Sequence, residues 1–196
     1  MPDTALESSK LAALETLLNE LRDNGHRALV FSQFVDYLQL VRARLDVLGM
    51  RYQYLDGGTS SAARAESTKA FQAGEGDVFL ISLKAGGFGL NLTGADYVVH
   101  LDPWWNPAVE DQASDRAHRI GQTRPVTIYR LVMQGSIEEK ILALHASKRE
   151  LADDLLEGGG GTLDADDLLN LLVEMHGPHA AAEVSAYEPV SENSVP

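Results

Sequence analysis

Two arginines stand three residues apart in the run Gln112-Ala-Ser-Asp-Arg-Ala-His-Arg-Ile-Gly-Gln122. The run lies late in a helix predicted from Pro107 to His118, at the carboxyl edge of the predicted sheet. Residues three apart share one helical face, so we expect the guanidinium groups of Arg116 and Arg119 to point the same way. Planar guanidinium forks hold phosphate oxygens and stabilise the charge that develops during phosphoryl transfer. The alternative is a solvated helix face that is salt-bridged to nearby aspartates.

A second run, Ser82-Leu-Lys-Ala-Gly-Gly-Phe-Gly-Leu-Asn91, places three glycines directly after a predicted buried strand. Glycine lets the backbone approach a ligand closely and point its amides toward it, which favours contact with phosphate or a nucleotide. The alternative is an ordinary glycine-rich turn. The run is neither the dinucleotide-binding pattern GxGxxG nor a P-loop.

Polar and aromatic side chains follow other predicted strands. Ser32 and Gln33 come just after the first strand and Thr59 follows the second, where hydroxyl and amide groups can bind phosphate without reading base identity. Ordinary turn formation is the alternative. Both tryptophans stand side by side in Asp102-Pro-Trp-Trp-Asn-Pro107, where an exposed indole can stack on nucleic acid and a buried one packs beneath the loop.

The residue types that are missing exclude several chemistries. The sequence has no cysteine, so disulfides and cysteine-ligated zinc or iron-sulfur sites are excluded. The histidines fall in unrelated elements or in the predicted tail, and we expect no metal site from them. No GxxxxGK(S/T) pattern and no Gly-Lys pair occur, so the loop that cradles nucleotide phosphates in a P-loop ATPase is absent.

The net charge of −13 argues at first sight against a polyanionic partner. Seven of the 29 acidic residues, and no lysine or arginine, lie from Gly160 onward. The residues before it carry 22 acids against 16 bases, so the globular part is only mildly acidic and bulk charge leaves the partner open. No stretch approaches the roughly 18 unbroken apolar residues of a membrane span and no secretory pattern is present, which predicts a soluble, cytoplasmic protein without a membrane partner.

Apolar runs alternate with helical patterns along the chain. Strands are predicted at residues 27–32, 52–55, 78–82, 97–101 and 126–132. Parallel strands need long crossovers, so the alternation predicts an α/β fold, an open parallel sheet sandwiched by helices. Ligands of such sheets bind at the carboxyl ends of the strands, and we therefore expect the polar loops to lie together there.

One globular domain with a tail accounts for the whole chain. The domain is predicted over residues 1–157, and its last helix, at 136–156, begins with Ser136 as the N-cap. Four glycines at 158–161 form a predicted linker, followed by a short acidic helix at 162–176. Residues 177–196 are expected to be disordered.

Four blocks together resemble the SWI/SNF-type helicase-like ATPases of superfamily 2. The arginine run resembles the family's motif VI and the glycine run its motif V. Val30-Phe-Ser-Gln-Phe34 is similar to motif IV and Leu55-Asp-Gly-Gly-Thr59 to motif IVa, in the family's order. The resemblance covers roughly residues 11–156. It implies a RecA-like helicase C-terminal lobe, of the P-loop NTPase type but without its own P-loop, whose last helix is a brace toward the first lobe.

The resemblance also implies roles for single residues. The arginine fingers would be Arg116 and Arg119. The residues facing ATP would be Gln112, Gly89 and Asn91. The residues contacting the DNA backbone would be Ser32, Gln33, Thr59, Ser82, Lys84 and Trp105.

The function implied is that of a second motor lobe in an ATP-dependent translocase on double-stranded DNA. ATP with Mg²⁺ would bind mainly to an N-terminal RecA-like lobe of the same protein, since this chain also lacks an Asp-Glu pair, and the chain alone is predicted to be inactive. A bacterial source and a cytoplasmic, nucleoid-associated location are expected. The alternatives are a stand-alone lobe that binds DNA or protein without catalysis, and a strand-separating helicase.

Overall fold

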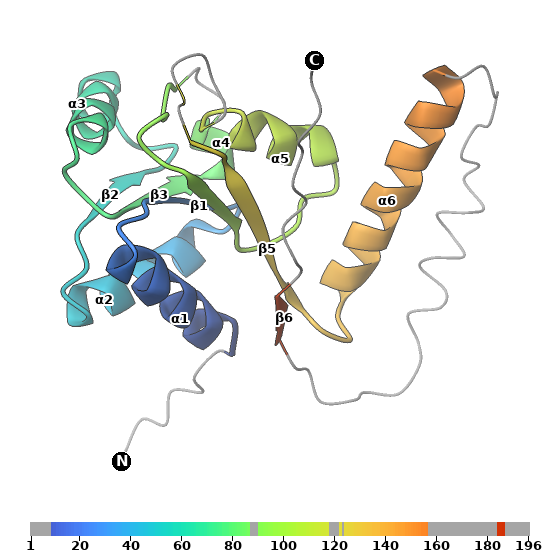
Figure 1. The fold of residues 1–196 in the computed structure, drawn as a ribbon, viewed down its shortest axis with the longest axis horizontal. Helices are drawn as coiled ribbons and strands as arrows, with labels where there is room; N and C mark the ends of the chain where they lie inside the picture. Colours follow the sequence, from blue (N-terminus) through green and yellow to red (C-terminus); the bar gives the residue numbers. More distant parts are fainter. Residues whose placement is uncertain (1–8, 87–89, 118–121, 123, 157–183, 187–196) are drawn as a thin grey trace.

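The computed structural model describes residues 9–86, 90–117, 122, 124–156 and 184–186. Its six strands form one sheet in the order β2-β3-β1-β4-β5-β6 (Figure 1). The strands are β1 (Ala28–Ser32), β2 (Tyr52–Leu55), β3 (Val78–Ser82), β4 (Tyr97–His100), β5 (Thr127–Met133) and β6 (Val184–Ala186). The helices are α1 (Ser9–Asp23), α2 (Val35–Val47), α3 (Ser61–Gln72), α4 (Leu83–Gly86), α5 (Pro107–Ser114) and α6 (Ile137–Leu156).

The strands from β1 to β5 pair in parallel throughout. The central strand β1 lies between β3 and β4, β2 adds to β3, and β5 adds to β4. Each return to the start of the next parallel strand passes through at least one helix, which provides the long crossover that a parallel connection requires. The predicted α/β fold with an open parallel sheet is confirmed.

Two layers of helices cover the sheet. Helices α1 and α2 lie on one face, whereas α3, α4 and α5 lie on the other (Figure 1). Side chains of β1 alternate between the two layers, because Val30 packs with α1 and α2 while Leu29 and Phe31 pack with the opposite helices. Burial on both faces explains why the central strands β1 and β3 read as nearly continuous apolar runs.

The helix ends follow local signals in the sequence. Gly25 and Gly49 lie just past α1 and α2 with positive φ angles of 74° and 60°, a conformation that glycine adopts without steric cost. At the start of α6 the Ser136 hydroxyl accepts a hydrogen bond from the Glu138 amide at 3.1 Å. The Glu139 carboxylate accepts one from the Gly135 amide at 2.8 Å, so both side chains cap the first turn.

Helix α5 is shorter than predicted. It ends at Ser114. The Asp115 amide still makes a helical i to i−4 bond to Asp111 at 2.9 Å, but the Arg116 and Ala117 amides make tighter i to i−3 bonds, to Ala113 at 3.2 Å and to Ser114 at 3.0 Å. The Arg116 carbonyl turns away to accept a hydrogen bond from the Leu92 amide at 2.9 Å. The prediction that Arg116 lies within this helix is therefore wrong, whereas the predicted shared face with Arg119 lies outside the described residues. The short helix α4, inside the glycine run, was not predicted either.

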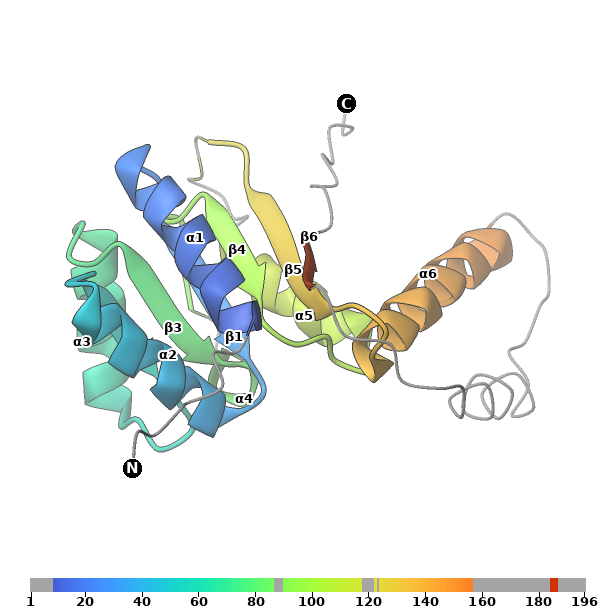
Figure 2. The same cartoon turned by 90° about the horizontal axis from the view of Figure 1, so that it is seen from below.

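The last helix projects from the sheet. Figures 1 and 2 show α6 starting beside the end of β5 and extending away from the other helices. The expected linker at 158–161 and acidic helix at 162–176 fall outside the described residues. Within the 177–196 segment that was expected to be disordered, β6 pairs antiparallel with β5, with Ala186 opposite Leu131. Among the described helices, none has the length and apolar character needed to cross a bilayer.

Candidate functional site

Four neighbouring strands end in the loops that were predicted to contact DNA. In the order β2-β3-β1-β4, the segments that follow these strands carry Thr59, Lys84, Gln33 and Trp105, with Lys84 in the short helix α4. The strand ends are level, since Ser32 of β1 is the register partner of Ser82 of β3. Adjacent strands lie about 4.8 Å apart, so the loops form one continuous edge. We refer to Gln33, Thr59, Lys84 and Trp105 as the strand-end surface.

A buried aspartate joins two of these loops. The Ser32 hydroxyl donates to the Asp102 carboxylate at 2.5 Å, and the Gln33 amide donates to its other oxygen at 2.8 Å. Burial raises the pKa of Asp102, while the hydrogen bonds from Ser32 and Gln33 act in the opposite direction. Ser32 is itself fully buried, so its hydroxyl fixes the loop after β1 to the loop after β4 and is turned away from solvent.

The hydroxyls of Ser82 and Thr59 also bond within the lobe. Ser82 is buried, and its oxygen accepts from the Ala85 amide at 3.3 Å in the first turn of α4. The Thr59 hydroxyl donates to the Asp56 carboxylate at 3.1 Å and accepts from the Asp56 amide at 3.0 Å. A hydrogen bond from the Tyr54 hydroxyl, with others from the turn, lowers the pKa of Asp56. Both hydroxyls therefore make the local hydrogen bonds of ordinary turns, which was the alternative to phosphate contact.

The two tryptophans have different environments. Trp104 packs against the apolar core on the α5 side of the sheet, whereas Trp105 is 52% exposed. The Trp104 amide donates to the Glu110 carboxylate at 2.7 Å, and Glu110 also accepts from Arg130 of β5 at 2.8 Å. The Trp104 carbonyl accepts from Nε2 of His145 at 2.5 Å. The backbone before Trp105 is thus held by α5 and by α6.

A buried lysine fixes the other end of the same loop. Nζ of Lys10, on α1, donates to the Leu101 carbonyl at 2.7 Å and to the Glu138 carboxylate at 2.7 and 2.6 Å. Glu138 also accepts from the Met133 amide at 2.8 Å. This cluster could not be predicted from the sequence, because Lys10 lies 91 residues from Leu101 and 128 from Glu138 and no local pattern marks such pairs.

The described part of the arginine run, residues 112–117 and Gln122, lies away from the strand-end surface. Arg116 is only 2% exposed, and its carbonyl pairs with Leu92. The Gln122 amide group donates to the carbonyls of Ala95 at 2.7 Å and Ala117 at 3.2 Å. Ala95 precedes β4, so Gln122 lies beside the amino end of that strand. The expectation that the arginines converge at the carboxyl edge of the sheet is wrong for Arg116, because α5 carries the chain back from that edge.

The residues predicted to face ATP are partly described. Gln112 and Asn91 are exposed, and their amide groups fit a peripheral contact with a nucleotide. Gly89 and Arg119 fall outside the described residues. Within the part of the chain that the structure describes, no group of three or more His, Asp or Glu side chains could hold a metal ion.

A buried histidine lies between β4 and the end of α5. Nε2 of His100 is 3.0 Å from the Ser114 hydroxyl, and its ring stacks on Phe31 at a centroid distance of 5.5 Å. Burial lowers the pKa of His100 to about 4. The imidazole is therefore neutral at physiological pH and supports the segment that precedes Arg116.

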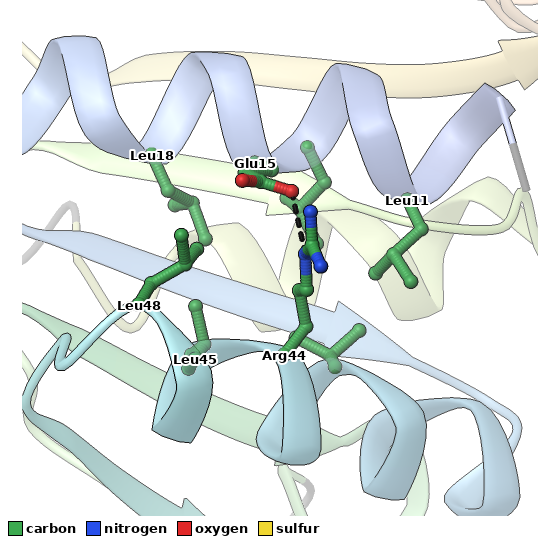
Figure 3. Close-up of a pocket in the computed structure, with 8 residues that line it drawn as sticks. Leu11, Glu15, Leu18, Arg44, Leu45 and Leu48 are labelled. Atoms are coloured by element: carbon green, nitrogen blue, oxygen red, sulfur yellow. Dashed lines mark hydrogen bonds and ion pairs between the residues drawn. The ribbon is translucent and has the colours of Figure 1, made fainter. Parts of the chain in front are cut away.

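A small hollow between α1 and α2 is unrelated to these residues. Figure 3 shows Glu15 and Arg44 pointing toward one another across it, and they pair at 2.7 Å. The rest of its lining is aliphatic: Leu11, Leu14, Leu18, Val41, Leu45 and Leu48. This lining suits helix packing and offers no further polar group for a nucleotide.

Comparison with known proteins gives consistent matches. Residues 9–121 match the Helicase conserved C-terminal domain. The chain is 41% identical over 172 residues to the chromatin-remodeling ATPase INO80 of Drosophila melanogaster, which covers 86% of this chain and 10% of that protein. It is 45% identical over 159 residues to the DNA repair protein RAD5 of Cryptococcus neoformans, covering 79% of this chain and 13% of that protein.

A solved structure agrees with these matches. The C-terminal part of the Fun30 ATPase domain superposes with a TM-score of 0.69 at 34% identity, covering 86% of this chain and 51% of that one. This chain therefore spans about a tenth of the length of the curated relatives it matches and about half of the structural one.

The relatives overturn one expectation and leave another without support. The cytoplasmic, nucleoid-associated location is contradicted, because the matched proteins include chromatin-remodelling ATPases of animals and fungi, and chromatin is a nuclear structure. The expected bacterial source finds no support, since these relatives are eukaryotic.

Proposed function

Because this chain belongs to the Helicase conserved C-terminal domain family, in the SWI/SNF-type branch of superfamily 2 ATPases, we propose that it is the second motor lobe of a DNA-dependent ATPase that moves along double-stranded DNA. The observation that carries the proposal is the alignment of four neighbouring loops in the strand-end surface. Relatives named as chromatin-remodelling and DNA-repair proteins support duplex DNA as the track.

On the DNA side, the exposed Lys84 and Trp105 and the half-exposed Gln33 make the contacts. Lys84 offers a cation and Gln33 an amide to the phosphates, and Trp105 stacks on or wedges against the nucleic acid. Ser32, Thr59 and Ser82 act indirectly, because their hydroxyls hold the loops in shape. These few contacts depend on where each group lies and not on the total charge of the lobe, so they are compatible with its net negative charge.

On the nucleotide side, ATP with Mg²⁺ binds mainly to a preceding RecA-like lobe and supplies the free energy of phosphoryl transfer. Arg119 reaches across to the phosphates as an arginine finger. Arg116 is too deeply buried to do the same, and its backbone carbonyl instead holds this part of motif VI against Leu92. Gly89, Asn91 and Gln112 border the nucleotide.

The test compares ATP turnover in two samples, this chain alone and this chain joined to the first lobe encoded with it. Each is assayed with and without duplex DNA. We expect no turnover from the chain alone and DNA-stimulated turnover from the pair. No ATP turnover in either sample, with DNA binding retained, would favour a stand-alone binding lobe. A strand-displacement assay on the pair separates translocation from unwinding.

A further inference from the structure

We propose that α6 holds the loop formed by residues 101–106 at two points and thereby sets the position of Trp105. The effect of this link on DNA rests on the proposed function, whereas the link itself does not. Glu138 and His145 are the α6 side chains that make it, directly or through Lys10. Both are positioning residues, since neither is among the groups proposed to touch DNA.

The first point of attachment lies at the start of the loop. The Leu101 carbonyl accepts from Lys10, whose ammonium group is buried and shares its protons with both oxygens of Glu138. Charge-assisted hydrogen bonds of this kind are short and directional. The first turn of α6 is therefore fixed to the backbone where β4 ends.

The second point lies two turns further along α6. Glu138 and His145 are seven residues apart, a spacing that places both on one face of a helix. Nε2 of His145 faces the Trp104 carbonyl, which can only accept, so this nitrogen carries the proton. His145 is buried, so water does not readily replace it as the donor.

The loop has little freedom between these points. Asp102 is held by Ser32 and the Gln33 amide, and the Trp104 amide is held by Glu110. Trp105 follows directly and stands 52% exposed at the strand-end surface. A shift of α6 must move this backbone or break buried hydrogen bonds. Because α6 extends away from the sheet (Figure 2), we expect a displacement of this helix to be passed to Trp105 through these two attachments.

The test uses four substitutions on α6. His145→Leu removes the donor, whereas His145→Gln keeps an amide nitrogen at the same number of bonds from Cα. Ala146→Ser, at an exposed neighbouring position, is the matched control. Glu138→Gln weakens the first point of attachment independently, in case His145→Leu does not fold.

The first readout is the mobility of Trp105 in the full chain. With Trp104→Phe in every sample, the fluorescence of Trp105 is the only tryptophan signal, and its anisotropy and acrylamide quenching are measured. We expect His145→Leu and Glu138→Gln to raise quenching and lower anisotropy, and His145→Gln and Ala146→Ser to match the parent. Unchanged values in both of the first two variants would overturn the link.

The second readout is the DNA dependence of ATP turnover, measured with the first lobe present. We expect the DNA concentration for half-maximal stimulation to rise about fivefold in His145→Leu, the equivalent of one hydrogen bond, and to recover in His145→Gln. Changed fluorescence with an unchanged DNA dependence would leave the link standing and would refute the proposed role of Trp105. Loss of DNA stimulation in the parent itself would instead refute the proposed function.

Discussion

Replacing Glu110 with alanine should destabilise the lobe by removing the central support of the tryptophan loop. The Glu110 side chain has no exposed surface, and its carboxylate lies 2.7 Å from the Trp104 amide and 2.8 Å from Nε of Arg130. Glu110→Ala leaves the amide without this acceptor and leaves a guanidinium group, only 19% exposed, without its nearest counter-charge.

The size of the effect follows from these contacts. Breaking a buried ion pair by removing one partner costs about 3 to 5 kcal/mol, because the other charge stays buried. Asp111 lies 3.9 Å from Arg130 and takes over part of the pairing, so we expect the lower end of that range, about 3 kcal/mol. Glu110→Gln keeps an oxygen for the Trp104 amide but loses the charge opposite Arg130, and should cost about 2 kcal/mol.

Urea unfolding followed by tryptophan fluorescence measures both variants. The free energy of unfolding falls with urea concentration by about 2 kcal/mol per molar in small proteins. The urea midpoint of Glu110→Ala should therefore fall by about 1.5 M while this dependence stays constant. Glu66→Ala, at an exposed position of α3, is the control and should change stability by less than about 0.5 kcal/mol. A loss below about 1 kcal/mol for Glu110→Ala would show that the ion pair does not stabilise the loop.

Three further predictions address pH, catalysis and DNA coupling. Burial lowers the pKa of His100 from 6.5 to about 4, so only the unfolded chain takes up this proton between those values. The contribution of the neutral His100 imidazole to stability is fully present above pH 6.5. Below that, the free energy of unfolding should fall by up to about 1.4 kcal/mol per pH unit toward pH 4. His100→Gln should remove this part of the slope in urea unfolding at several pH values, and an unchanged slope would contradict it. In the two-lobe protein, Arg119→Ala should lower ATP turnover about 10³-fold or more while duplex DNA still binds; near-normal turnover would exclude a finger. Trp105→Ala should reduce the stimulation of turnover by DNA, and an intact response would assign Trp105 to packing.

The central strands could be predicted closely because they are buried on both faces. The predicted range 78–82 coincides with β3, which is buried at every residue, and the range 52–55 coincides with the half-buried edge strand β2. An unbroken apolar run between turn residues leaves little doubt about where the strand begins and ends. The same reasoning located the strand-end loops, since parallel strands bring their carboxyl ends to one edge.

The end of α5 could not be predicted in the same way. The alanines and polar residues after Ser114 are compatible with a helix, so the local pattern continues to His118. What ends the helix is a tertiary contact, the hydrogen bond from the Leu92 amide to the Arg116 carbonyl. A helical pattern alone therefore placed Arg116 on an exposed face, whereas the fold buries it.

The buried polar residues were missed for a related reason. Lys10, Glu110 and Glu138 look like ordinary charges on helix surfaces when only their neighbours in sequence are considered. Their partners are brought close by the fold, and each partner is a backbone group or a charge on another element. The sequence pointed to the loop with the tryptophans, while the side chains that hold it became visible only in three dimensions.

Three hydroxyls at the strand ends form hydrogen bonds inside the lobe, and this affects how strongly an acidic lobe would bind DNA on the proposed function. Ser32, Ser82 and Thr59 are engaged in loop contacts, so on the proposed function direct contact with phosphates falls to Lys84, Gln33 and backbone amides. Neutral contacts position a duplex but release few counterions, and counterion release supplies most of the affinity of non-specific DNA binding. A lobe with this surface should grip DNA weakly by itself. On the proposed function that weakness is useful, because a motor that steps along DNA must loosen one lobe while the other holds, and a lobe with many lysine contacts would release slowly.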